Sequence, residues 1–115
     1  MVTGNAHDDC LFCKIIAGQI PSRKVFENET TYAFEDINPK AAVHVLVVPK
    51  KHYKNVYELS QNAPDELVDL VAVAQKIADD TYGGAYRLVF NTGEEAGQSV
   101  FHVHAHVLTG QRFEE

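Results

Sequence analysis

Several features that mark other classes of protein are missing from this sequence. No run of apolar residues approaches the roughly 20 that a membrane-spanning helix needs. Residues 1–9 are polar and acidic rather than like a secretion signal, so we expect no membrane partner and a cytoplasmic location. Basic residues are outnumbered, with 10 Lys and Arg against 16 Asp and Glu. Since nucleic-acid binding relies on excess positive charge, nucleic acid is not an expected partner.

Cysteine is scarce as well. Only Cys10 and Cys13 are present, and two cysteines this close in sequence cannot tie distant parts of a fold together. The pair must therefore serve metal binding, redox chemistry or packing.

The remaining composition is that of one globular domain. Apolar residues make up 45% of the 115 residues, which is ordinary for a protein with a core. Residues 1–9 have no periodicity and are expected to form a flexible arm. Residues 10–115 are then a single domain.

Hydrophobic spacing predicts two helices and five strands. A short helix covers residues 10–17, and a long helix begins at Asn62-Pro64 and ends at Gly83-Gly84. The apolar stripe of the long helix consists of Leu67, Leu70, Val71, Ala74, Ile77 and Ala78. Strands are predicted at 24–27, 31–35, 43–48, 86–91 and 101–108. Because the strands are joined mainly by short turns, the fold class is α+β with an antiparallel sheet of about five strands.

Three alternating histidines stand out in the last predicted strand. His102, His104 and His106 are two positions apart, so their side chains should share one face. The opposite face should pack on the core through Phe101, Val103, Ala105 and Val107. Crowded imidazoles oppose one another's protonation, which keeps a neutral, nucleophilic nitrogen available near pH 7.

The loop before this strand contains groups suited to phosphate. Its glycines, Gly93 and Gly97, permit close backbone approach, while the acidic pair between them should face solvent. Polar side chains that could donate to phosphate oxygens flank the loop: Asn91, Gln98 and Ser99.

The run from Gln98 to Leu108, QSVFHVHAHVL, resembles the signature of the histidine triad (HIT) family, in its Hint-like branch. The resemblance extends through the segments 10–16, 34–37 and 44–50, and so covers nearly the whole chain. It implies a HIT-like fold, a homodimer that joins two sheets, and hydrolysis of phosphoramidates of purine nucleosides. The product would be a nucleoside 5'-monophosphate, either AMP or GMP.

The same resemblance implies a role for each matching residue. His104 would be the nucleophile that forms a nucleotidyl intermediate, and His106 would contact the phosphate and assist proton transfer. Asn91, Gln98 and Ser99 would bind phosphate or the leaving group. Asp36 would hold the ribose, although it could instead stabilise the turn that follows it. The base would lie among Leu11, Phe12, Ile15, Phe34 and Ile37, for which core packing is the alternative.

The cysteine pair has the spacing of a zinc chelate, but a closed structural site needs four ligands. The resemblance implies that His44 and His102 complete it, which would take His44 away from a proton relay with the other histidines. A redox pair or two packed thiols are the alternatives. His7 and His52 are expected to be solvated.

Other functions remain open on the residues alone. The histidines could serve a nucleotide-binding regulatory module with little turnover, or an enzyme that hydrolyses dinucleoside polyphosphates. They could also form a metal centre of three imidazoles. The resemblance further implies that, in the C-terminal tail, Gln111 and Arg112 shape the substrate groove and reach the partner subunit.

Overall fold

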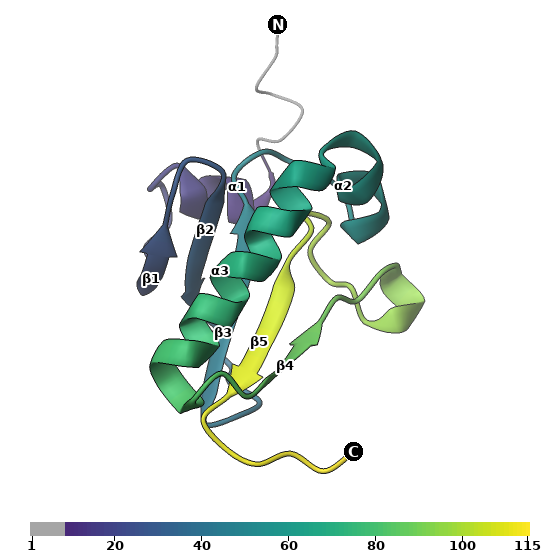
Figure 1. Ribbon diagram of the computed structural model, residues 1–115. Coiled ribbons are helices and arrows are strands. Elements are labelled where there is room, and N and C mark those ends of the chain that lie inside the picture. The colour runs from purple at the N-terminus through teal and green to yellow at the C-terminus, as the bar shows by residue number, and fades with distance from the viewer. Residues whose placement is uncertain (1–8) are drawn as a thin grey trace, which may run out of the picture.

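The computed structural model describes residues 9–115, so His7 and nearly all of the predicted arm lie outside the described residues. The elements follow one another along the chain as Figure 1 shows. They are α1 (Leu11–Ile16), β1 (Lys24–Glu27), β2 (Thr31–Glu35), β3 (Val43–Pro49), α2 (Val56–Asn62), α3 (Pro64–Tyr82), β4 (Tyr86–Val89), the 3-10 helix η2 (Glu94–Ala96) and β5 (Ala105–Thr109).

The five strands form one sheet in the order β1-β2-β3-β5-β4, and every neighbouring pair is antiparallel. The α+β prediction is therefore confirmed. Helix α3 crosses one face of this sheet, and both edges are formed by short strands (Figure 1).

Side chains alternate along the central strands and build a separate apolar cluster on each face. The cluster under α3 includes Val45, Val47, Ala105 and Val107. The cluster on the other face joins Leu46 and Val48 to residues of β2 and α1. Since His44 and His106 alternate with the residues of the α3 cluster, they belong to the face that α1 partly covers.

Helix α3 begins and ends close to where the sequence predicts. Pro64 occupies its first turn, and Gly83 ends it in the left-handed conformation with φ 63°. One residue of the predicted stripe is wrong, because Val71 is exposed while Val73 is buried in its place. Within the described residues no helix, α3 included, combines the length and apolar character needed to cross a membrane.

Helix α2 is absent from the predicted elements, although a capping signal precedes it. The Asn55 side chain accepts a hydrogen bond from the Glu58 backbone N–H at 2.9 Å, and the Glu58 carboxylate accepts one from the Lys54 N–H at 2.6 Å. These two bonds satisfy donors at the start of a helix of only seven residues. Its shortness gives too little periodicity for prediction.

The last strand is shorter than predicted, because it begins at Ala105 rather than Phe101. The preceding residues bond elsewhere: Val103 donates its N–H to the Tyr53 carbonyl at 2.7 Å, and the His102 ring contacts the Pro49 carbonyl at 2.8 Å. Phe101 is exposed rather than packed on the core.

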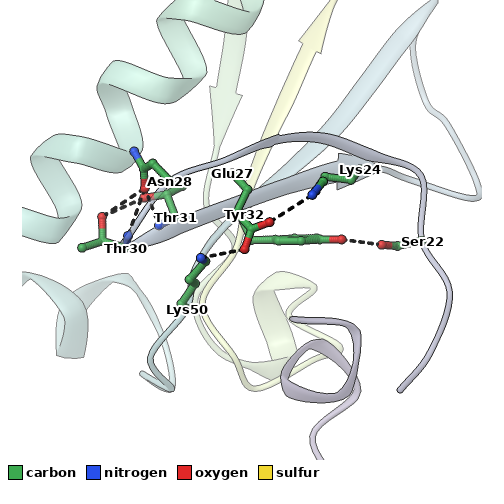
Figure 2. A network of polar contacts seen from close by, with 8 residues as sticks. All are labelled: Ser22, Lys24, Glu27, Asn28, Thr30, Thr31, Tyr32 and Lys50. Carbon is green, nitrogen blue, oxygen red and sulfur yellow. Dashed lines mark hydrogen bonds and ion pairs between the residues drawn. The ribbon is translucent and has the colours of Figure 1, made fainter. Parts of the chain in front are cut away.

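A polar network fastens the β1–β2 hairpin to α3. Figure 2 shows the Asn28 side chain accepting hydrogen bonds from the backbone N–H groups of Thr30 and Thr31. The Asp69 carboxylate on α3 accepts from the hydroxyls of both threonines, at 2.8 and 2.6 Å, and from the Asn28 amide. Hydrogen bonds from these side chains lower the pKa of Asp69, so it is a carboxylate at neutral pH.

Candidate active site

Three histidines lie together on the face away from α3, and strand pairing positions two of them, His44 and His106. His106 lies directly opposite Leu46, and His44 lies opposite Leu108. His44 and His106 are therefore diagonal neighbours, with ring centroids 5.2 Å apart. The His104 ring is 5.0 Å from that of His106.

His104 has a fixed tautomer. Its Nδ1 lies 2.9 Å from the backbone oxygen of His102, and because a carbonyl only accepts, Nδ1 must carry the proton. The lone pair of the neutral ring is then on Nε2. The side chain is 7% exposed. Burial lowers the pKa of His104 more than the carbonyl and Asp36 raise it, so the ring is neutral near pH 7.

His44 and His106 form a hydrogen-bonded pair whose protons can be placed in the same way. The Lys40 backbone N–H donates to His44 Nδ1 at 3.0 Å, so His44 carries its proton on Nε2. That nitrogen donates to His106 Nδ1 at 2.9 Å and lies 3.4 Å from an oxygen of Asp36. His106 must then hold its own proton on Nε2, which is buried and has no partner within the described chain.

Burial is the main cause that lowers the pKa of His106, to about 4, and repulsion by His104 and His44 adds to it. Burial likewise lowers the pKa of His44. The face thus presents one nitrogen lone pair, on His104, and one unpartnered N–H donor, on His106. A nucleophile and a proton donor are the two groups that phosphoryl transfer through nitrogen requires.

An apolar cavity of about 520 Å³ opens in front of these rings. It contains nine of the predicted site residues: Leu11, Phe12, Ile15, Phe34, Asp36, Ile37, Ser99, His104 and His106. Ile37 is 91% exposed, so core packing does not explain its position at this cavity. Phe12 and Phe34 are buried and meet edge to face, with ring centroids 5.5 Å apart.

A second cavity of about 450 Å³ adjoins the first and is more polar. Asn91 lines only this second cavity, whereas Asp36, Asn38, Ser99 and His106 line both. Asp36 also accepts a hydrogen bond from the Asn38 N–H at 2.8 Å, so it does stabilise the turn, as the alternative interpretation states.

Gln98 does not reach either cavity, which corrects its prediction as a phosphate ligand. It is 2% exposed, and its amide nitrogen donates to the backbone oxygens of Lys54 and Val100. Its amide oxygen accepts from the Gly93 N–H at 2.9 Å. Gln98 therefore holds the loop in shape. That loop needs glycine at Gly93 and Gly97, whose φ values are 92° and 99°.

His102 does not share a group with the other two histidines. Its ring faces the cysteines, with Nδ1 3.5 Å from Cys10 Sγ and 3.4 Å from Cys13 Sγ. His52 Nδ1 lies 3.4 Å from Cys13 Sγ. These four ligand atoms lie within 4.8 Å of one another. His102, His104 and His106 therefore do not form a metal centre of three imidazoles.

Two predictions about the metal ligands are corrected by this cluster. His44 is wrong as the fourth ligand, because β3 carries it to Asp36 and His106 instead. His52 is not simply solvated but takes that place. The signal was available: His52 follows the end of β3, and antiparallel pairing puts that end beside the start of β5.

The chemistry of the cluster fits a divalent metal ion. The His102 Nε2 faces the Pro49 carbonyl, so its proton lies there and the Nδ1 lone pair points at the sulfurs. Burial, and then the adjacent Cys10, raise the pKa of the Cys13 thiol to about 12. A second thiolate beside Cys10 is therefore unfavourable unless a cation offsets the negative charge. Two sulfur and two imidazole donors are a set that zinc prefers.

Comparison with known proteins gives one consistent result. Residues 9–114 match a family model described as "Scavenger mRNA decapping enzyme C-term binding". The chain is 44% identical over 102 residues to "Protein hit" of Bacillus subtilis, covering 88% of this chain and 70% of that protein. A "HIT family hydrolase" from Clostridium thermocellum has a TM-score of 0.88 and 43% identity, over 94% of this chain and 96% of that one. A "histidine triad nucleotide-binding protein" from Candida albicans has a TM-score of 0.75 and 39% identity, over 85% and 72%.

Proposed function

Because the chain belongs to the histidine triad family, we propose that it is a nucleotidyl hydrolase of the Hint-like branch. Its substrates are phosphoramidates or related conjugates of a purine nucleoside, and its product is AMP or GMP. The observation that carries this proposal is the Nε2 lone pair of His104, buried beside an apolar cavity and next to the His106 donor. Similar solved structures named a hydrolase and a nucleotide-binding protein support it.

The apolar cavity accommodates the nucleoside. Its aromatic and aliphatic side chains provide two sides for a purine, with Phe12 buried and Ile37 at the solvent side. The Asp36 carboxylate lies between this cavity and the polar one, where it can accept hydrogen bonds from ribose hydroxyls. The phosphorus then lies beside His104 and His106.

In the first step the Nε2 of His104 attacks phosphorus, and the bond from phosphorus to the leaving nitrogen breaks. The covalent intermediate carries a positive imidazole ring, which the His102 carbonyl stabilises through the Nδ1–H. The bound phosphate anion raises the proton affinity of the His44–His106 pair, which takes up one proton. His106 gives a proton from Nε2 to the leaving amine.

Asp36 lets the pair carry that extra proton. His44 Nε2–H has two acceptors within reach, His106 Nδ1 at 2.9 Å and Asp36 at 3.4 Å. When His106 Nδ1 becomes protonated, the His44 N–H turns to the carboxylate. Water then attacks the intermediate, His106 Nε2 accepts its proton, and the nucleoside monophosphate leaves His104 neutral.

We propose zinc as the ion of the Cys10, Cys13, His52 and His102 cluster, with a structural role. A bound ion there supplies no step of the reaction but fixes the backbone of His102, whose carbonyl orients the nucleophile. This arrangement leaves His44 available for the relay.

We propose that the protein is a homodimer joined through β4. This strand is an edge of the sheet, so one side of its backbone has no partner strand among residues 9–115. Helix α3 exposes Val68, Val71 and Tyr82 on the side opposite Asp69, which faces the β1–β2 hairpin. In analytical ultracentrifugation we expect the parent protein to sediment as a dimer and the Val71→Glu variant to sediment as a monomer.

Turnover tests the function. Purified protein should hydrolyse adenosine 5'-phosphoramidate to AMP, and His104→Ala should not, while still binding AMP. Binding of AMP by the parent protein without turnover would favour a regulatory module, and cleavage of diadenosine polyphosphates alone would favour the related hydrolase activity. Hydrolysis by His104→Ala at the parent rate would overturn the proposal.

A further inference from the structure

The polar cavity beside His106 contains a cation that the mechanism above does not use. We propose that this cavity is a subsite for an anionic leaving group and that Lys40 is the residue that selects for its charge. The inference rests on the proposed function, and it names the class of leaving group that the same site takes.

The position of the cavity relative to the nucleophile identifies it as the leaving-group side. Of the two cavities, His104 lines only the apolar one, whereas His106 lines both. In phosphoryl transfer the attacking and leaving atoms lie roughly in line on opposite sides of phosphorus. With the nucleoside in the apolar cavity, a leaving group that takes the proton of His106 therefore departs into the polar cavity.

This polar cavity is lined by one cation that has no ion pair with a described carboxylate. Its charged lining residues are Lys40 and Asp36, since His44 and His106 are neutral in the free protein. Asp36 already accepts one hydrogen bond, from the Asn38 N–H, and lies beside the His44 N–H. No described carboxylate forms an ion pair with Lys40. The other cation near the site, Arg23, lines the apolar cavity and lies 3.8 Å from Glu35.

The backbone of Lys40 is held at this place by two constraints. Its N–H donates to His44 Nδ1 at 3.0 Å, and the preceding Pro39 restricts the chain. Asn91 and Ser99 add neutral polar groups to the same cavity. A leaving group with a negative charge near the scissile bond would therefore meet the Lys40 ammonium and two uncharged hydrogen-bonding side chains, beside an Asp36 carboxylate that already accepts a hydrogen bond. The structure favours a carboxylate, as in an amino acid linked to phosphorus through its amino nitrogen, or a phosphate in the same position.

The test compares two adenosine phosphoramidates that differ only in charge, made from alanine and from alaninamide. The value of kcat/KM is measured for both with the parent protein, Lys40→Gln, Lys40→Arg and Lys76→Gln. For each protein we divide kcat/KM for the alanine compound by kcat/KM for the alaninamide compound. Comparing this ratio between proteins removes the intrinsic difference in reactivity between the two amines. Lys76→Gln, which loses the same charge on the exposed face of α3, is the matched control.

A partly exposed ion pair contributes up to about 1 kcal/mol, which is about fivefold. We expect the alanine to alaninamide ratio to fall about fivefold in Lys40→Gln, and to stay at the parent value in Lys40→Arg and Lys76→Gln. A derivative of 2-aminoethyl phosphate, tested in the same way, distinguishes a phosphate from a carboxylate. An equal ratio in the parent protein and Lys40→Gln for both anions would overturn the inference.

Affinity separates failure of this inference from failure of the proposed function. The dissociation constants of the same compounds are measured by calorimetry on His104→Ala, with and without Lys40→Gln. If the parent protein turns over none of the compounds, the hydrolase proposal fails, while the affinity ratio still tests Lys40. No binding of either compound would overturn both.

Discussion

Replacing His44 with alanine should weaken catalysis selectively for leaving groups that need a proton. His44 is buried, and its Nε2–H fixes His106 so that the Nε2 proton of His106 faces the cavity. General acid–base assistance is worth about 10²–10⁴-fold. Loss of the bond that orients the acid should remove a large part of it, so we expect kcat to fall about 100-fold, which corresponds to about 2.7 kcal/mol.

Two substrates are compared, of which only one has a leaving group that needs a proton from His106. Adenosine 5'-phosphoramidate releases an amine that needs a proton, whereas the p-nitrophenyl ester of AMP releases a phenolate that does not. Single-turnover rates for His44→Ala should fall about 100-fold on the first and only severalfold on the second. His44→Gln, which keeps an N–H donor, should recover part of the first loss. Equal losses on both substrates, in a variant that melts at the parent temperature, would refute the relay.

Three further outcomes are expected. Purified protein should contain one zinc ion per chain by mass spectrometry, and Cys13→Ser should lose it and melt at a lower temperature. The free energy of unfolding should fall as the pH drops from about 6.5 towards 4, because the pKa of His106 is lowered in the folded protein and the unfolded chain therefore takes up this proton at a higher pH. In urea titrations, His106→Asn should make the free energy of unfolding depend less on pH over this range. Asp69→Ala removes the acceptor of two threonine hydroxyls and should cost about 3 kcal/mol in the free energy of unfolding, whereas the exposed Asp80→Ala should stay within about 0.5 kcal/mol.

Local patterns predict the framework of this protein well. The strand from Val43 and the helix from Pro64 carry strong periodicity over many residues, and both lie where expected. Helix α2 has only seven residues, and its main signal is the cap at Asn55. Short elements are specified mainly by their ends and by tertiary contacts, which a periodicity search does not detect.

The candidate site shows the same division between local and long-range information. The alternation of His104 and His106 is a local pattern, and the structure places both at the cavity although β5 begins only at Ala105. The metal cluster depends instead on which residue meets the cysteines in space. The strand starts only after His102, and the end of β3 brings His52 rather than His44 to the sulfurs. The register of β3 with β5 decides this, and no single segment contains that information.

Covalent catalysis by His104 is tested most directly by the intact mass of the protein after rapid mixing with adenosine 5'-phosphoramidate and quenching without acid. We expect a nucleotidyl adduct that appears before AMP and maps to the peptide containing His104, and we expect no adduct in His104→Ala. Turnover by the parent protein with no adduct at any time, under conditions that preserve a synthetic phosphohistidine standard, would contradict covalent catalysis by His104.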